Sequence, residues 1–536
     1  MKRTLSLTIL MAFAIVSVAI LLSWPGFNRL SAAESTEPLR GQRPAPEFPA
    51  ELDWLNLGDR KLSLEDLRGK VVLLDFWTYG CINCIHIIPD LRKLEAKYAD
   101  ELVVIGVHSA KFAQEGKTEN IQRLVIRYDL EHPVVNDNQM QIWRSFGARA
   151  WPTLVLIDPA GNLVGGLSGE GHYDTLDHAI GRIINTFEND EENPIKRGHV
   201  ELKLEKEAVA NNTLLFPGKV LADEENQRLF ISDTSHHRIL VTDLDGKVQH
   251  VYGKKGEPAL KDGKSGEARF AWPQGMSFGP GAEGKNQLYV ADTENHVIRL
   301  IDLNTHEVST VAGIGKQQYQ LQDYGPALTT GINSPWDVME WDGLIYIAMA
   351  GQHQVWTYNP ADKTLHAFAG SRREELRDGA LLRGGLNQPS GLATDGTSLY
   401  IADSEASAIR VATTGDEGRL DTVVGLGLFD FGDRDGKGNK VLLQHPLGVA
   451  YWPKGEDGFN LVLADTYNSK LKWLNPETRE VRTIASTADV LDEPGGISIS
   501  KDNIYIADTN NHQIRVMELA SGKLRSIVLT DGENRL

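Results

Sequence analysis

The sequence has 536 residues, a net charge of −18 and 41% hydrophobic residues. A chain of this length exceeds what one hydrophobic core can organise, so we expect two or more domains. Its acidic balance would repel a phosphate backbone, which disfavours nucleic acid as a partner. The 51 glycines and 22 prolines indicate many turns and therefore many short strands.

The first 33 residues have the pattern of an export segment. Lys2 and Arg3 precede an apolar run over residues 5–24, which is long enough to span a bilayer. Small residues at positions 31–33 suit cleavage by signal peptidase, so residues 1–33 are predicted to be either a signal peptide or a membrane anchor. Because the positive charges precede the apolar run, the rest of the chain is predicted to be extracytoplasmic, that is periplasmic or secreted. It would meet a membrane only through this segment.

Two linkers are predicted to flank an α/β domain. Residues 34–52 are rich in Pro, Glu and small polar residues, and residues 191–215 are charged and interrupted by Pro194. In residues 53–190, apolar strands alternate with helical segments, which is typical of an α/β sheet with both faces covered. The predicted strands cover 71–76, 102–107, 154–158 and 163–166, and the predicted helices cover 84–98, 120–128 and 175–187.

Two cysteines, Cys81 and Cys84, lie between the predicted strand at 71–76 and the helix that follows it. An exported chain can form disulfides, but one pair in 536 residues is not a framework that holds a fold together. A helix N-terminus carries N–H groups without helical partners and a partial positive charge, and both stabilise a thiolate. We therefore predict a redox pair in which Cys81 is the exposed attacking thiolate and Cys84 the buried resolving thiol.

Other interpretations of the pair are weaker. A structural disulfide across two intervening residues would constrain the unfolded chain little. Zinc needs four ligands and only His86 lies nearby to add a third, so no metal or other cofactor is predicted. A peroxidase of the Thr-x-x-Cys type, suggested by Thr78, would need a proline where Leu74 stands. A redox site that has lost its activity stays open as an alternative.

The residues around the pair resemble the thioredoxin superfamily. The match includes Asp75-Phe76-Trp77 before the Cys-Ile-Asn-Cys motif, Pro89 inside the helix, and Trp151-Pro152-Thr153 at the start of a strand. The resemblance implies a cis peptide before Pro152, which would face the cysteines and present backbone to a partner chain. It also implies a helical insertion around residues 111–128. The Ile-Asn dipeptide differs from Gly-Pro, so the redox potential does not follow from the resemblance.

Asp75, Trp77, Tyr79 and Trp151 complete the predicted site. Asp75 stands where the superfamily has a buried carboxylate, and burial would raise its pKa and allow it to exchange a proton with Cys84. The alternative is a solvated Asp at a strand end. Trp77 and Tyr79 are predicted to wall the groove around the cysteines, although aromatics in such places pack as core about as often. Trp151 is bulkier than usual before the proline and would narrow the groove.

Residues 216–530 repeat one pattern six times: an entry proline, an apolar strand, an Ala-Asp-Thr-like motif and a β-branched strand. The shortest interval between entry prolines, from Pro446 to Pro494, is 48 residues, and the longest, from Pro273 to Pro335, is 62. These intervals are close to those of four-stranded propeller blades. The repeats resemble NHL-repeat propellers, so we predict six blades. The entry prolines are Pro217, Pro273, Pro335, Pro389, Pro446 and Pro494.

Recurring polar residues in the six copies predict a structural role. Because they recur, the aspartates are predicted to cap turns through hydrogen bonds to the backbone. Metal ligation or catalysis would instead require these side chains to converge at one end of the propeller. The residues are Asp233, Asp292, Asp403, Asp465 and Asp508, with His237, His296, His353 and His512 following four of the motifs and an interblade aspartate at Asp262, Asp323, Asp378 and Asp435.

The whole chain, a multidomain α/β plus all-β protein, resembles the family of thioredoxin–NHL fusions typified by NHL repeat-containing protein 2. We predict an extracytoplasmic thiol–disulfide oxidoreductase whose redox partner is a protein dithiol or disulfide. Its propeller would be a platform for a protein or a small ligand. The alternative is an adaptor whose propeller binds a partner while the thioredoxin-like domain is redox-inactive, and a propeller lyase or hydrolase is a third hypothesis.

Overall fold

The computed structural model describes residues 37–209, 211–281, 284–320, 322–415 and 417–531. The predicted export segment, residues 1–33, lies outside them. Within the described residues, none of the helices combines the length and apolar character needed to cross a bilayer. The chain divides into two compact units: one holds the described residues up to 78 together with 83–110 and 131–203, and the other holds 79–82, 111–130 and 204 onward.

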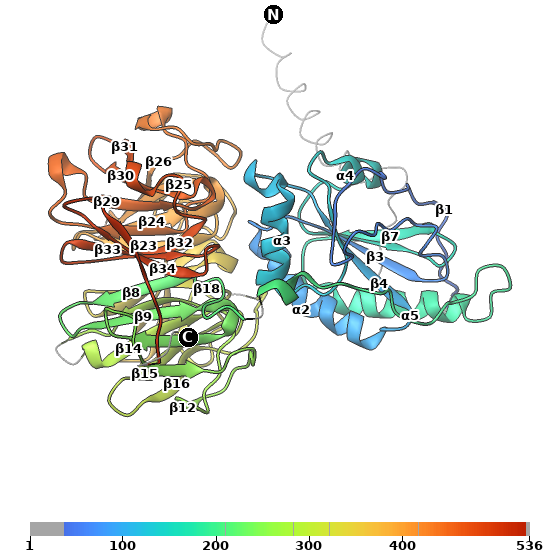
Figure 1. Cartoon of the computed structure of the whole chain (residues 1–536), viewed down its shortest axis with the longest axis horizontal. Coiled ribbons are helices and arrows are strands. Elements are labelled where there is room, and N and C mark those ends of the chain that lie inside the picture. The colour runs from blue at the N-terminus through green and yellow to red at the C-terminus, as the bar shows by residue number, and fades with distance from the viewer. Residues whose placement is uncertain (1–36, 210, 282–283, 321, 416, 532–536) are drawn as a thin grey trace, which may run out of the picture. The chain divides into compact units, whose positions relative to one another are not determined.

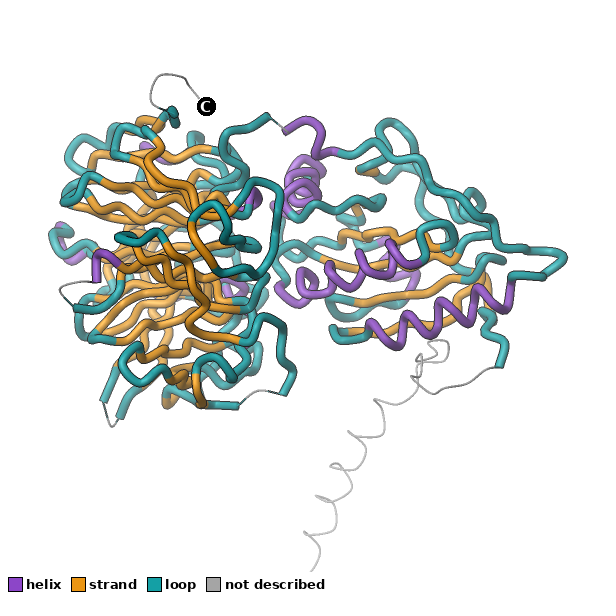
Figure 2. The backbone as a smooth tube through the Cα atoms, turned by 90° about the horizontal axis from the view of Figure 1, so that it is seen from below, coloured by secondary structure: helices purple, strands orange, loops and turns teal. Residues whose placement is uncertain are grey.

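The first unit is built on a mixed sheet with the strand order β1-β7-β6-β3-β4-β5-β2 (Figures 1 and 2). The central strand β3 is parallel to β4 and antiparallel to β6, and all its residues are buried. The strands are β1 (Arg43–Pro44), β2 (Trp54–Leu55), β3 (Val71–Trp77), β4 (Leu102–His108), β5 (Val134–Asn136), β6 (Thr153–Ile157) and β7 (Asn162–Ser168).

Alternation along β3 sends its side chains to two different cores. Val71 and Leu73 pack with apolar residues of helices α2 (Ile82–Lys97) and α5 (Tyr173–Phe187). Val72, Leu74 and Phe76 point to the opposite face, which is covered by α4 (Gln141–Phe146) and the N-terminal loops. Asp75 follows Leu73 by two residues, so its carboxyl group lies on the face that α2 covers.

Every predicted strand and helix of this region is present, but the predicted limits of the domain were wrong. Arg43 and Pro44 pair with β7, and Phe48 and Leu52 are buried in the core, so residues 43–52 belong to the folded unit and not to a linker. The composition misled because a short edge strand tolerates proline, which has no N–H to pair. At the other end the unit extends beyond residue 190 to Lys203, which bridges to Leu57.

The second unit contains a propeller of six sheets in the described residues, as the repeats predict (Figure 1). Its blades consist of β8 (Lys219–Asp223), β9 (Arg228–Asp233), β10 (Arg238–Thr242) and β11 (Val248–Gly253); β12 (Gly263–Lys264), β13 (Pro273–Phe278), β14 (Gln287–Asp292), β15 (Val297–Asp302) and β16 (Glu307–Gly313); and β17 (Tyr324–Pro326), β18 (Pro335–Trp341), β19 (Leu344–Met349), β20 (Gln354–Asn359) and β21 (Thr364–Ala369). The remaining blades consist of β22 (Gly379–Ala380), β23 (Pro389–Thr394), β24 (Ser398–Asp403), β25 (Ala408–Thr413) and β26 (Arg419–Val424); β27 (Gly436–Lys437), β28 (Gly448–Tyr451), β29 (Leu461–Asp465), β30 (Lys470–Asn475) and β31 (Glu480–Thr483); and β32 (Pro494–Ser500), β33 (Asn503–Asp508), β34 (Gln513–Glu518) and β35 (Leu524–Ile527). Helix α3 (Thr118–Arg127) belongs to this unit as well.

The recurring aspartates tie each blade to its own entry loop. In all five copies, one carboxylate oxygen accepts the backbone N–H of the residue two positions before the entry proline. These donors are Leu215, Ala271, Asn387, Gln444 and Asp492. The aspartates therefore have the structural role that their recurrence predicts.

The recurring histidines and threonines tie each blade to the next. The His237 ring accepts the N–H of Trp272, just before the next entry proline, and His296, His353 and His512 do the same in their copies. The Thr509 hydroxyl donates to the carbonyl of Pro217 (2.9 Å), which joins the last blade to the first. Because these rings accept backbone hydrogen bonds, a role for them as metal ligands or catalysts loses its support.

Candidate functional site

The cysteine pair lies where β3 leads into α2. Cys81 directly precedes the first helical residue, and Cys84 lies in the first turn of the helix. Cys84 is 1% exposed, as predicted for the resolving thiol. Cys81 is only 8% exposed, so the prediction of an exposed attacking thiol was wrong for this conformation.

Contacts within the second unit fix the residues on either side of Cys81. The Ile82 N–H donates to Oε1 of Gln388 (2.9 Å), and the Gly80 N–H donates to Oε1 of Glu115 (3.0 Å). Gln388 thereby occupies one of the helix N-terminal N–H groups that would otherwise stabilise a thiolate.

Tyr79 is fixed by the same unit. Its hydroxyl donates to Oε1 of Glu493 (3.1 Å), and its ring packs edge-on against Tyr467 with ring centroids 5.0 Å apart. Burial and the Glu493 carboxylate raise the pKa of Tyr79 well above its usual value. Tyr79 is therefore a packed residue here, and its place in a partner groove stays a prediction.

Asp75 is a buried carboxyl group without full hydrogen-bond partners. It is 4% exposed, and its Oδ1 atom accepts no hydrogen bond from the described residues. Burial raises the pKa of Asp75 to about 7, while the charge of His132 opposes that shift. A carboxyl group with a pKa near neutrality can both accept and return a proton at pH 7.

The remaining predicted site residues are Pro152, Trp151 and Trp77. The Trp151–Pro152 peptide is cis, and Pro152 is buried at the start of β6. The Trp151 ring packs against Trp143, with centroids 4.7 Å apart. Trp77 is 3% exposed and contacts His108 edge-on at 4.8 Å, so it packs as core. The parts that Pro152, Trp77 and Trp151 would play in binding a partner stay predictions.

His86, the residue considered as a third zinc ligand, lies on α2 beside a glutamate. Its side chain is 3% exposed, and its Nδ1 atom lies 2.8 Å from Oε2 of Glu170. The Glu170 carboxylate is thus a partner of this histidine.

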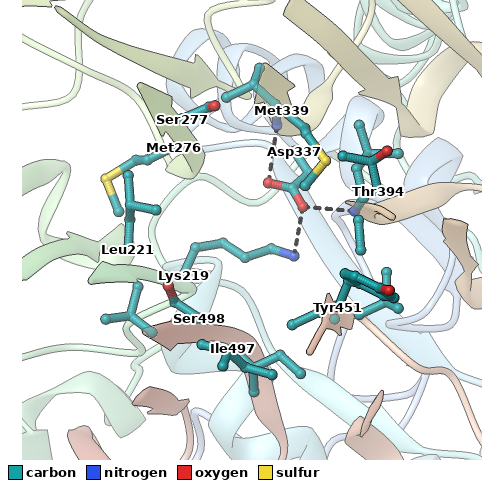
Figure 3. A pocket seen from close by; sticks show the side chains of 18 of the residues that line it. Lys219, Leu221, Met276, Ser277, Asp337, Met339, Thr394, Tyr451, Ile497 and Ser498 are labelled. Atoms are coloured by element: carbon teal, nitrogen blue, oxygen red, sulfur yellow. Dashed lines mark hydrogen bonds and ion pairs between the residues drawn. The ribbon is translucent and has the colours of Figure 1, made fainter. Parts of the chain in front are cut away.

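A pocket of about 270 Å³ lies on the propeller axis, lined by the innermost strands of all six blades (Figure 3). Lys219 extends across it and donates to the carbonyls of Ser390 and Leu447 (2.8 Å each), and its ammonium lies 3.5 Å from Asp337. Asp337 also accepts the Leu392 N–H (3.0 Å). Because these charged groups satisfy one another across four blades, they hold the blades together, and the predicted binding of a ligand here stays untested.

The sequence of this chain is similar to those of known proteins. A thioredoxin-like family model matches residues 69–163, and an NHL-repeat model matches residues 491–517. NHL repeat-containing protein 2 of Homo sapiens is 40% identical over 91% of this chain and 72% of its own length. The chain belongs to the NHL repeat-containing protein 2 family.

Two further relatives show how the family's parts recur. Protein SUPPRESSOR OF QUENCHING 1, chloroplastic, of Arabidopsis thaliana is 42% identical over 89% of this chain but only 47% of its own length. The thiol–disulfide oxidoreductase ResA of Bacillus cereus is 27% identical over 32% of this chain and 95% of its own. NHL repeat-containing protein 2 thus shares the whole fusion with this chain, whereas ResA is similar to the thioredoxin-like part alone.

Sequence reasoning missed three residues that shape the site: His132, Glu95 and Glu115. His132 acts on Asp75 electrostatically, and Glu95 contacts His132. Glu115 is fully buried and accepts the N–H groups of Gly80, Lys111 and Phe112. Their partners are distant in the sequence or set by the fold, so only the folded arrangement reveals their roles.

Proposed function

We propose that this chain is an extracytoplasmic thiol–disulfide oxidoreductase that exchanges two electrons with protein disulfides through Cys81 and Cys84. The observation that carries the proposal is Asp75, a buried carboxyl group with a pKa near 7 on the sheet face that the cysteine-bearing helix covers. A thioredoxin-like domain favours protein thiols as partners, and the name of the relative ResA supports the same reaction class. The extracytoplasmic location rests on the sequence of residues 1–33.

In the proposed reaction, the cysteine pair reduces a disulfide of a partner protein. The Cys81 thiolate attacks one sulfur of the partner disulfide, and the other partner sulfur leaves as a thiolate. Cys84 gives its proton to the Asp75 carboxylate and attacks Cys81. A bond between Cys81 and Cys84 forms as the mixed disulfide breaks, and the second partner sulfur leaves. A protein dithiol then reduces the pair again, with the same bonds exchanged in reverse.

Two single substitutions test this proposal on the full chain. With a small disulfide substrate and dithiothreitol as the reductant, we expect C81S to be inactive and to form no mixed disulfide. C84S should also lose turnover, and when it is mixed with the disulfide substrate without dithiothreitol it should accumulate a stable mixed disulfide at Cys81, detectable by mass spectrometry. Turnover by C81S above the rate of dithiothreitol alone would overturn the proposal.

The burial of Cys81 favours a second candidate, an adaptor in which the propeller binds a protein and the cysteines are inactive. Cys81 is 8% exposed, and Gln388 holds the residue that follows it. A C81S/C84S double variant separates the candidates. If that variant supports the full cellular phenotype of the wild-type chain, the adaptor is correct.

A further inference from the structure

A histidine and a glutamate extend from Asp75 toward solvent. Asp75 on β3 pairs in register with Gly106 on β4, so the two residues face the same side of the sheet. A side-chain carbon placed on Gly106 would lie 3.5 Å from Nε2 of His132 and 3.0 Å from Nε1 of Trp77. The missing side chain at Gly106 therefore leaves room for the His132 ring on the face that carries the Asp75 carboxyl group.

His132 connects this interior face to the surface. Its Nδ1 atom lies 3.2 Å from Oε1 of Glu95 on α2. The His132 side chain is 4% exposed, whereas that of Glu95 is 26% exposed. An imidazole with one nitrogen directed inward and the other on a partly exposed carboxylate has the arrangement of a proton shuttle.

The backbone around His132 fixes the position of the ring. The Asn56 side-chain amide donates to the His132 carbonyl (2.8 Å), and the Gly106 N–H donates to the Pro133 carbonyl (2.9 Å). These contacts join the loop before β5 to the sheet. The ring is thus held beside Gly106 by its own main chain.

The other groups that face Asp75 are poorer proton carriers. His108 lies two residues beyond Gly106 on the same side of the sheet, but burial lowers its pKa to about 3, so it is neutral at physiological pH. On the other neighbouring strand, Leu154 is opposite Asp75. From α2 come Cys84, which is the proton donor, and Glu95, which His132 separates from Asp75.

We propose that His132 and Glu95 carry the proton that passes between Asp75 and solvent. This inference rests on the proposed function of the cysteine pair. When Cys84 is deprotonated, its proton resides on Asp75; the Asp75 O–H then gives it, through one bridging water, to Nε2 of His132. The Nδ1–H of the same ring passes to Glu95 and from there to water, and the reverse sequence protonates Cys84 when the pair is reduced. No electrons move in these steps.

The test measures one resolution step on the full chain. Cys81 is first converted to a mixed disulfide with thionitrobenzoate, and attack by Cys84 releases the yellow thiolate in a stopped-flow record. We expect H132A to slow this release by about 100-fold or more at pH 7, because positioned acid–base groups contribute roughly 10²- to 10⁴-fold. Added imidazole should restore the rate, because it fills the space of the deleted ring. E95Q should slow the release less and shift its pH profile.

A matched control separates chemistry from structure. H86A removes another buried histidine–glutamate pair of the same unit, and imidazole should restore nothing there. Release from H132A at the wild-type rate, or slow release that imidazole does not restore, would overturn the relay while leaving the proposed function intact. If the wild-type chain itself released no thionitrobenzoate, the proposed function would fail instead.

Discussion

Asp75 in the first unit and Asp292 in the propeller are both buried carboxyl groups, yet their surroundings differ. Asp292 accepts hydrogen bonds from the Ala271 N–H, the Asn295 amide and the Arg299 guanidinium. Asp75 has an oxygen with no such partner among the described residues. Burial raises the pKa of Asp75 to about 7 and that of Asp292 to about 6. Burial alone therefore does not identify a proton carrier, and the lack of competing hydrogen-bond donors does.

The propeller repeats the Asp292 arrangement in other blades. The buried Arg299 also reaches the interblade Asp262 (2.8 Å), and Arg410 joins Asp403 to Asp378 in the same way. Lys472 takes this place between Asp465 and Asp435. These carboxylates are committed to structure, whereas Asp75 can still change its protonation state.

The largest effect on stability should come from removing a propeller carboxylate whose oxygens are fully hydrogen-bonded. D292A leaves the Arg299 charge buried without its main partner, which should destabilise the propeller by about 3–5 kcal/mol. Denaturant unfolding of the full chain, followed through the propeller transition, measures this loss. Thiol exchange by the folded protein should not change. A loss of unfolding free energy below about 1 kcal/mol would show that the Asp292 ion pair does not hold the propeller together.

D75N should have an effect of opposite sign that depends on pH. Because the pKa of Asp75 is raised to about 7 in the folded chain, wild-type stability should fall as the pH rises from about 4, the usual unfolded value, to 7. The amide removes this dependence, so D75N should be more stable than wild type at pH 8, by on the order of 4 kcal/mol. Near pH 4 the two should be similar.

Urea unfolding of both proteins at several pH values measures this difference. Parallel stability–pH curves for wild type and D75N would contradict the assignment of Asp75 as a buried group that titrates near neutrality. D75N should also slow the release of thionitrobenzoate, which no propeller aspartate should affect.

The smallest effect should come from the hydrogen bond that joins the last blade of the propeller to the first. T509V removes the hydrogen bond to the Pro217 carbonyl but keeps the shape of the side chain, at a cost of about 1 kcal/mol. T293V removes the equivalent bond to the Pro335 carbonyl between neighbouring blades and serves as its control. Equal losses in unfolding free energy would show that every joint is alike. A several-fold larger loss in T509V would mark the closing joint as special.

Local patterns in the sequence predicted much of this molecule. The six entry prolines and Ala-Asp-Thr motifs gave the blade count, because each blade repeats the same short-range pattern. The resemblance to the thioredoxin superfamily predicted the burial of Asp75. What the patterns could not show depends on contacts between distant residues.

The relay and the burial of Cys81 illustrate this limit. His132 lies on the face of the sheet that carries Asp75 only because β4 pairs with β3 in a register that sets Gly106 beside Asp75. Gln388, which covers the start of α2, is 306 residues away from its partner Ile82. No periodicity or motif records such pairings, since each joins residues that are far apart in the sequence.

The redox equilibrium of the cysteine pair tests the central claim most directly. The full chain is equilibrated at pH 7 with stepped ratios of reduced and oxidised dithiothreitol and quenched with acid. It is then unfolded and alkylated, and mass spectrometry counts the alkylated cysteines. We predict that Cys81 and Cys84 are oxidised together in one two-electron transition. The ratio of oxidised to reduced protein should change tenfold for each step of about 30 mV. Two alkylated cysteines at every potential would contradict it.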